Sequence, residues 1–194
     1  MPPKVKVSKE DIIKTGVTLV RKFGVESINA RAVANELNCS TQPIFSNFST
    51  MQELEKEVIA YSYGIYSDFI KREVESDKYP KYKAFGMAYV RFAKEEKELF
   101  KLLFMRDRTD EDKSPAPDFE ESVKMVMEIN KISYKKATLM HLEIWTCVHG
   151  IATMIATSFL LLEWELISDM ISDVYNGLLA RHLPKEDKNE CYKD

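Results

Sequence analysis

The chain has 194 residues, 45% of them apolar, so it is long enough to bury a core and does not have the composition of a disordered protein. Its formal net charge of −3 argues against a protein that binds polyanions over its whole surface. The charge is unevenly distributed, however, because residues 1–50 carry seven Lys or Arg against four Asp or Glu. The first quarter is the basic part of an acidic protein.

Six glycines and the lack of any useful alternating pattern predict an all-α protein. The first helix is expected to start after Ser8, an N-cap residue, with Asp11 near the positive end of the helix dipole. Apolar residues then recur at helical spacing as far as Gly24, where we expect this helix to end.

Two short helices are predicted next. Asn29 is a good N-cap for a helix that runs through Leu37, and Asn38 tolerates the left-handed conformation that ends helices. We expect Ser40 to cap a further helix over residues 41–47, which makes Pro43 its third residue, where no intrahelical N–H bond is lost. This pattern predicts a helix-turn-helix; an ordinary antiparallel helix pair remains the alternative.

Downstream, helices are expected at 51–74, 80–94, 96–105, 134–161 and 163–182, with an exposed loop at 107–118. We therefore predict about nine helices, divided into a three-helix head at residues 1–50 and a larger helical body at residues 51–194. The head should be held together by five apolar side chains: Phe23, Val33, Leu37, Phe45 and Phe48. Residues 144–162 carry no formal charge, but acids rather than Lys or Arg flank them, so no membrane span is predicted.

Several other classes of function have no support in the sequence. Three cysteines at no metal-ligand spacing favour neither a disulfide framework nor a zinc site, and the N-terminus has no signal-peptide pattern, so a cytoplasmic location is expected. No glycine-rich phosphate loop, nucleophile elbow or distinctive carboxylate pair is present. We expect no enzyme activity, no metal and no cofactor.

The first fifty residues resemble the N-terminal domain of the TetR (tetracycline-repressor-like) family of transcription regulators. The resemblance rests on ordered, ungapped positions: Ile12, Thr15-Gly16, Leu19-Val20, Gly24, Ile28-Asn29-Ala30, Val33-Ala34, Asn38-Cys39-Ser40, Phe45, Asn47-Phe48 and Leu54. Three positions differ from the family pattern, since Phe45 replaces a tyrosine, Asn47 a histidine and Met51 a lysine. Without that hydroxyl and that ammonium group, two phosphate contacts would be missing.

This resemblance implies that the second helix of the motif reads double-stranded operator DNA. Thr41 and Gln42 would contact bases, because glutamine can pair bidentately with adenine. Arg31 would lie near a base edge or a phosphate, or would simply be an exposed helix residue. The remaining expected DNA-contacting residues are Lys4, Lys6, Lys9, Asn29, Ser40, Phe45, Ser46 and Asn47.

A second motif, Trp145 to Gly150, resembles the Trp-x-x-x-His-Gly signature of the ligand-binding half of a subgroup of that family. It implies a pocket for an apolar or amphipathic effector, with six expected lining residues: Tyr89, Phe92, Phe104, Met125, Trp145 and His149. For His149 a core role with a satisfied hydrogen bond is favoured over ligand binding.

The last helix is apolar over a wide arc, more than one contact surface requires. We expect homodimerisation through a four-helix interface formed by the last two helices, with four residues of the final helix in the interface: Ile167, Ile171, Val174 and Leu178. The predicted function is a dimeric, ligand-responsive repressor at a palindromic operator. A helical protein-interaction adaptor whose head no longer binds DNA is the alternative.

Overall fold

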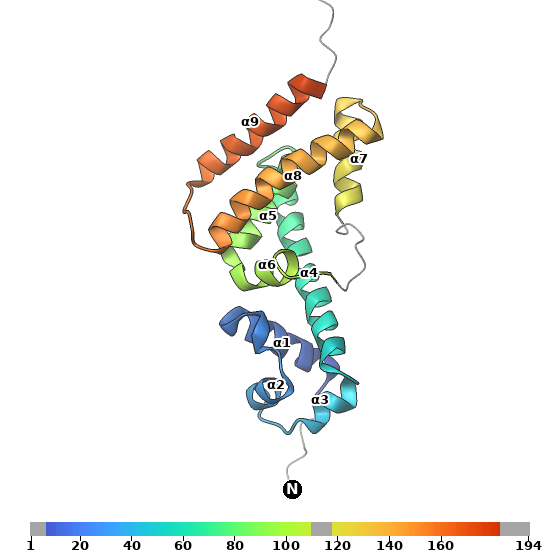
Figure 1. The fold of residues 1–194 in the computed structure, drawn as a ribbon, viewed down its shortest axis with the longest axis vertical. Helices are drawn as coiled ribbons and strands as arrows, with labels where there is room; N and C mark the ends of the chain where they lie inside the picture. Colours follow the sequence, from blue (N-terminus) through green and yellow to red (C-terminus); the bar gives the residue numbers. More distant parts are fainter. Residues whose placement is uncertain (1–6, 110–117, 183–194) are drawn as a thin grey trace, which may run out of the picture. The chain divides into compact units, whose positions relative to one another are not determined.

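The computed structural model describes residues 7–109 and 118–182, and all regular structure in these ranges is helical (Figure 1). The elements are α1 (Lys9–Phe23), the 3-10 turn η1 (Val25–Ser27), α2 (Ala30–Glu36), α3 (Gln42–Asn47), α4 (Met51–Glu75), α5 (Lys81–Glu95), α6 (Lys97–Phe104), α7 (Phe119–Asn130), α8 (Tyr134–Ala156) and α9 (Trp164–His182). The prediction of an all-α protein with about nine helices is confirmed for the described part of the chain.

By compactness the chain divides into two units. The first unit comprises Met1–Arg72 and Arg91–Asp107, and so contains α1–α3, most of α4, the end of α5, and α6. The second unit comprises Glu73–Val90 and Arg108–Asp194, with most of α5 and with α7–α9. The predicted boundary between head and body at residue 50 falls inside the first unit and stays a prediction.

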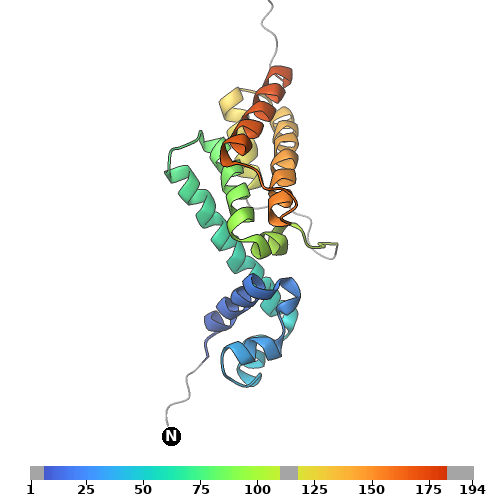
Figure 2. The same cartoon turned by 90° about the vertical axis from the view of Figure 1, so that its left-hand side faces the viewer.

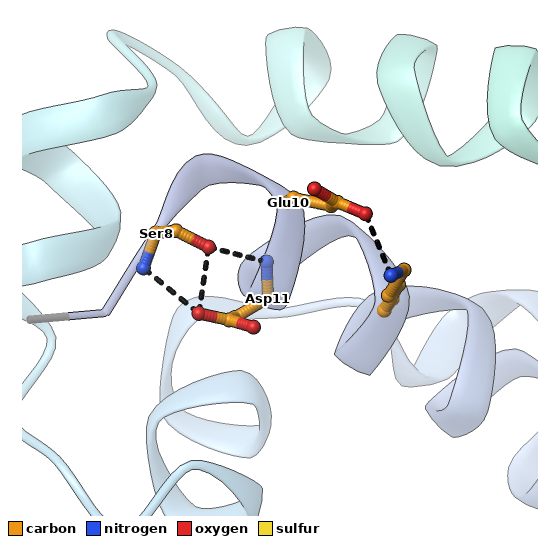
Figure 3. Close-up of polar contacts among 4 residues, drawn as sticks. Ser8, Glu10 and Asp11 are labelled. Carbon is orange, nitrogen blue, oxygen red and sulfur yellow. Dashed lines mark hydrogen bonds and ion pairs between the residues drawn. The ribbon is translucent and has the colours of Figure 1, made fainter. Parts of the chain in front are cut away.

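The start of α1 is fixed by a capping box, as the sequence predicts (Figure 3). The Ser8 hydroxyl oxygen accepts from the backbone N–H of Asp11 at 3.0 Å, while the Asp11 carboxylate accepts from the backbone N–H of Ser8 at 3.1 Å. These bonds from Ser8 lower the pKa of Asp11. The helix ends at Gly24, whose φ of 83° is open to glycine and unfavourable for other residues.

Helix α1 lies close to α4 within the first unit. A Cβ atom placed on Gly16 would lie 2.6 Å from Cγ2 of Val58, so only glycine fits this crossing. The ammonium of Lys9 reaches Glu57 of α4 at 2.6 Å. Farther along α1, Arg21 binds the carboxylate of Glu96 through two nitrogens, at 2.8 and 2.6 Å. These contacts join α1 to α4 and to the turn before α6.

Helix α7 was not among the predicted ranges. Its first turn carries Glu120 and Glu121, and Val123 and Val126 are buried at helical spacing. It ends at Lys131, which adopts the left-handed conformation with φ of 53°. The apolar pattern of this helix is present in the sequence, but it is short, because the buried face of a 12-residue helix contains few apolar residues. Most of the predicted loop at 107–118 lies outside the described residues.

Helix α8 ends at Ala156, so its predicted end at residue 161 was wrong. Ser158 adopts a left-handed φ of 56°, and the amides of Phe159 and Leu160 both donate to the carbonyl of Met154, at 2.9 and 3.3 Å. This is a helix-ending arrangement of backbone bonds. The apolar residues that follow extend the helical sequence pattern, but the backbone has already turned.

Two tyrosine–histidine hydrogen bonds join α5 to α8 in the second unit. The Tyr82 hydroxyl lies 2.9 Å from Nδ1 of His141, and the Tyr89 hydroxyl lies 2.8 Å from Nδ1 of His149. Because both partners advance together along the sequence, α5 and α8 run parallel. Burial raises the pKa of Tyr82 and lowers the pKa of His141 to about 4, so this pair is neutral at pH 7.

Helix α5 also contacts α9, which lies beside α8 (Figures 1 and 2). The Lys83 ammonium donates to the hydroxyls of Ser168 and Ser172, both at 2.7 Å. A Cβ atom on Gly86 would lie 3.8 Å from Cδ1 of Ile171, which places that isoleucine against α5. Within the second unit, α5 is therefore in contact with both α8 and α9.

Among the described helices, α8 is long and apolar enough to cross a membrane by length and composition. However, 44% of its most apolar window is buried inside the fold, and it packs against α7 and α9. The core helix of a globular protein passes the same test, so this finding carries no membrane assignment.

We predict that the stability of the second unit falls with decreasing pH because of His141. Above pH 6.5 the ring is neutral in folded and unfolded chains; between 6.5 and about 4 only the unfolded chain binds the proton. Between pH 7.5 and 4.5 the free energy of unfolding should therefore decrease in both proteins, but by about 2–3 kcal/mol more in the wild type than in the His141→Gln variant. Urea unfolding at both pH values measures this. An equal decrease in both proteins would contradict the prediction.

Candidate functional site

The turn between α2 and α3 has helix-turn-helix geometry. Asn29 caps α2, because its Oδ1 accepts from the Ala32 N–H at 2.9 Å while its Nδ2 donates to the Ser27 carbonyl at 3.3 Å. Asn38 takes the predicted left-handed conformation, with φ of 51°. Both polar ends of the Asn29 side chain thus have a structural role, which leaves it less suited to a contact with DNA.

The start of α3 differs from the prediction. The cap is Thr41 and not Ser40, because the Thr41 carbonyl accepts from the amides of Ile44 and Phe45 at 3.1 and 3.2 Å. Pro43 is consequently the second helical residue. It still lies in the first turn, where a missing N–H breaks no intrahelical bond.

The two faces of α3 have different surroundings. Ile44, which was not among the predicted core residues, is fully buried, and so is Phe48. Phe45 is 54% exposed and Phe23 is 70% exposed, so the prediction that both belong to the core of the head was wrong. The other predicted core residues are buried or half-buried: Val33 and Leu37. Phe45 is exposed because the neighbouring Ile44 occupies the inward position.

The polar side chains of α3 differ in whether they form hydrogen bonds within the protein. The Ser46 hydroxyl donates to the Gln42 carbonyl at 2.9 Å, and Nδ2 of Asn47 donates to the Pro43 carbonyl at 2.7 Å. Gln42 is exposed, and its side-chain amide makes no hydrogen bond to another described residue. Ser40 is exposed and Thr41 half-exposed beside it. Gln42 therefore presents the most complete set of unused donors and acceptors on this helix.

Most cations of the head are paired with acids. Lys9, an expected phosphate contact, binds Glu57 and lies 5.2 Å from the centre of the Phe48 ring. Arg31 is exposed and has no acidic partner within the described residues. Lys4 and Lys6 lie outside the described residues. Three further cations of the head are paired: Lys14 with Glu10, Arg21 with Glu96, and Lys22 with Glu36.

The six expected effector-binding residues are divided between the two compact units. Phe92 and Phe104 belong to the first unit, where both lie 5.3 Å from the Tyr66 ring centre and where Phe104 also lies 5.3 Å from Phe100. Phe92 is fully buried. Close aromatic packing of this kind accounts for the buried Phe92 and the half-buried Phe104 without a ligand, and their effector role stays a prediction.

The other four expected residues belong to the second unit. The Trp145 ring stacks on His149, with centroids 5.1 Å apart and planes at 21°, and Trp145 is 42% exposed. His149 is half-buried and its Nδ1 lies 2.8 Å from the Tyr89 hydroxyl, and burial lowers its pKa. The hydrogen bond of the favoured interpretation is present, and the choice between a core and a ligand-binding role stays a prediction. Met125 is buried on α7.

The expected dimer residues require a correction. Ile167 and Ile171 are 1% and 4% exposed, so they belong to the core of their own protomer. Val174 and Leu178 are partly exposed. Exposed large apolar side chains on α8 and α9 come instead from five other residues: Tyr134, Leu139, Leu142, Trp145 and Leu166. The leucines at 139 and 142 share a helix face with Trp145 through their spacing of three, a sequence signal that the prediction did not use.

Comparison with known proteins agrees with this description. A family model described as the tetracyclin repressor-like C-terminal domain matches residues 82–181, just over half of the chain. The crystal structure of a TetR-like transcriptional regulator from Rhodococcus sp. RHA1 is similar in fold, with a TM-score of 0.63 and 12% identity over 93% of this chain and 98% of that one. No curated protein sequence matches the chain. The chain belongs to the tetracycline repressor-like family of transcription regulators.

Proposed function

We propose that the protein is a cytoplasmic, homodimeric transcription regulator, without enzyme activity, that represses from a palindromic operator and is released by a small molecule. The observation that carries the proposal is that α3, the second helix of the helix-turn-helix, has one buried apolar face and one exposed face. Ile44 and Phe48 face the core, while Gln42 and Phe45 are exposed. A recognition helix needs such a division, because one face must hold the helix while the other enters the major groove.

A homodimer follows from the geometry of operators. Two heads must reach half-sites about 34 Å apart to read successive turns of the major groove. The exposed leucines of α8, Leu139 and Leu142, support a self-complementary contact, as a two-fold interface requires. We therefore move the proposed interface from Ile167 and Ile171 to this face of α8 and to Leu166, with Val174 and Leu178 at its edge.

An apolar or amphipathic effector would bind in the second unit. Tyr89, Trp145, His149 and Met125 remain the proposed pocket residues, whereas Phe92 and Phe104 pack on Tyr66 in an aromatic cluster of the first unit. Effector and DNA would weaken each other's binding by the same factor, as linkage demands. Helix α4 is the proposed lever, since it continues from the first unit into the second.

The adaptor remains a second candidate because four cations of the head are held by acids. A head with few available cations is weakly suited to a polyanion. Salt dependence separates the two functions. A regulator shows a specific complex whose affinity falls steeply with salt, whereas an adaptor forms no specific complex at any salt concentration.

We predict that Gln42→Ala weakens binding to the specific site by about 1–3 kcal/mol and has little effect on random DNA. The reason is that its free side-chain amide suits a bidentate contact with adenine. Fluorescence anisotropy with fragments retained from the protein's own genome, beside a scrambled duplex, measures both affinities. Equal weakening on both duplexes would assign Gln42 to a phosphate contact.

Arg31→Ala is the matched control on the same head. Because Arg31 is the described cation of the head that no acid pairs, its removal should weaken specific and random DNA alike. The slope of log affinity against log salt should decrease by about 1 for each phosphate that the variant no longer binds. A sequence-dependent weakening with an unchanged slope would place Arg31 at a base edge.

For the dimer, we predict a species of twice 22.5 kDa in sedimentation at micromolar concentration. Leu142→Glu should give 22.5 kDa monomers that lose specific DNA binding, because a charge would be placed in the apolar interface. Ile129→Glu is the control, since Ile129 is also an exposed apolar residue but lies on α7. Ile171→Glu is unsuitable, because it buries a charge inside the protomer. A dimeric Leu142→Glu protein would contradict the proposed face.

For the effector, we predict that compounds which release DNA also change the fluorescence of Trp145, because the indole offers a large contact area and one donor. Candidate hydrophobic compounds are titrated into the wild type and into Trp145→Phe, beside a DNA-release assay. The variant should bind them more weakly, with Trp164 as the remaining fluorophore. Unchanged wild-type fluorescence together with equal binding by the variant would place the pocket elsewhere.

A further inference from the structure

Phe45 is a large apolar side chain on the face of α3 that points away from the core. Its ring is 54% exposed, although it lies in the middle of an ordered helix. Ile44 and Phe48 already fill the inward face, and Phe45 forms no ring contact with another described residue. The exposed ring lies on the same helix as the exposed Gln42, three residues away, so both side chains are available to a partner that binds this face of α3.

We propose that Phe45 reads the 5-methyl group of a thymine, next to the base pair that Gln42 contacts. This inference rests on the proposed DNA binding of the head. It assigns sequence recognition to a residue that has no polar atom and that stands where the related family has a tyrosine. A phenyl ring cannot donate to a phosphate, so the phosphate contact of a tyrosine hydroxyl is not possible here.

The chemistry of the major groove selects the partner. Of the groups that base pairs present there, donors and acceptors dominate, and the methyl of thymine is the apolar one. A phenyl ring placed against that methyl removes apolar surface from water on both sides. Contact with donors or acceptors would instead leave them without a hydrogen bond.

The geometry of α3 places the two residues proposed to contact bases, Gln42 and Phe45, next to each other. Gln42 and Phe45 are three residues apart, so their side chains are neighbours on one helix face, separated by about 5–6 Å at their Cβ atoms. That separation suits contacts to neighbouring base pairs. Ser46 and Asn47 donate to backbone carbonyls of their own helix and do not compete for these edges. Gln42 and Phe45 would together favour adenine and thymine in each half-site.

The test replaces single thymines by deoxyuridine, which removes only the methyl group. A specific site is first selected from a randomised, unmethylated synthetic duplex, so that thymine is its only methyl-bearing base and 5-methylcytosine is excluded as the source. We expect wild-type affinity to fall about three- to fivefold, the value of one buried methyl group, at one thymine of each half-site. Deoxyuridine elsewhere in the site should have no effect.

Three variants locate the contact. Phe45→Ala should bind thymine and deoxyuridine duplexes equally at that position, whereas Phe45→Tyr, which keeps the ring, should retain the methyl dependence. Gln42→Ala should also retain it while losing preference at the neighbouring pair. Because Phe45 is exposed, the alanine variant should keep its thermal stability, and the wild-type titration is informative without any variant.

Two results would overturn the inference while leaving DNA binding intact. One is a specific wild-type complex that is insensitive to deoxyuridine at every thymine, which would indicate that the ring touches sugar or nothing at all. The other is an unchanged methyl dependence in Phe45→Ala, which would assign the methyl to another residue. If selection yields no specific site, the proposed function fails and the inference with it.

Discussion

The close approach of α1 and α4 at Gly16 is the constraint on which the arrangement of the head depends. A Cβ atom at this position would come within 2.6 Å of Val58, a distance that side chains do not adopt. With no side chain in between, Val58 is fully buried and Lys9 can reach Glu57 along the same contact. Helix α3 ends only four residues before α4 begins, so anchoring α4 also orients α3. Ile44 then faces inward, and the neighbouring α3 residues at 42 and 45 face outward.

The positive charge that the head can offer to DNA is smaller than the sequence suggests, because several of its cations are paired with acids. The surplus of +3 over residues 1–50 looks like a basic DNA-binding surface. In the fold, however, Lys9 and Arg21 are paired with acids outside those fifty residues, at 57 and 96. Exposed pairs of this kind contribute little to stability, but they reduce the charge that phosphates can bind. A head of this type would depend more on contacts with base edges than on its overall charge.

The Trp-x-x-x-His-Gly motif has a local physical explanation in the second unit. One helical turn separates Trp145 from His149, and the two rings stack at 5.1 Å. Nδ1 of the imidazole hydrogen-bonds the Tyr89 hydroxyl, which fixes the orientation of the ring, and burial lowers the pKa of His149. An added Cβ atom on Gly150 would meet nothing within 4 Å, so the space at this glycine is open. The motif thus joins a part-buried hydrogen bond to an exposed indole.

The sequence by itself determined most of the features that arise within about four residues, although the cap of α3 and the end of α8 were misplaced. The caps at Ser8 and Asn29 and the left-handed Asn38 were predicted, because side-chain caps and backbone turns are local interactions. Only the tertiary structure decided which apolar residues are covered. Phe45 and Ile171 both lie in helical apolar patterns, yet one is exposed and the other is buried against α5. Helical spacing shows which residues share a face, but it carries no information about the distant helix that packs there, and burial depends on that helix.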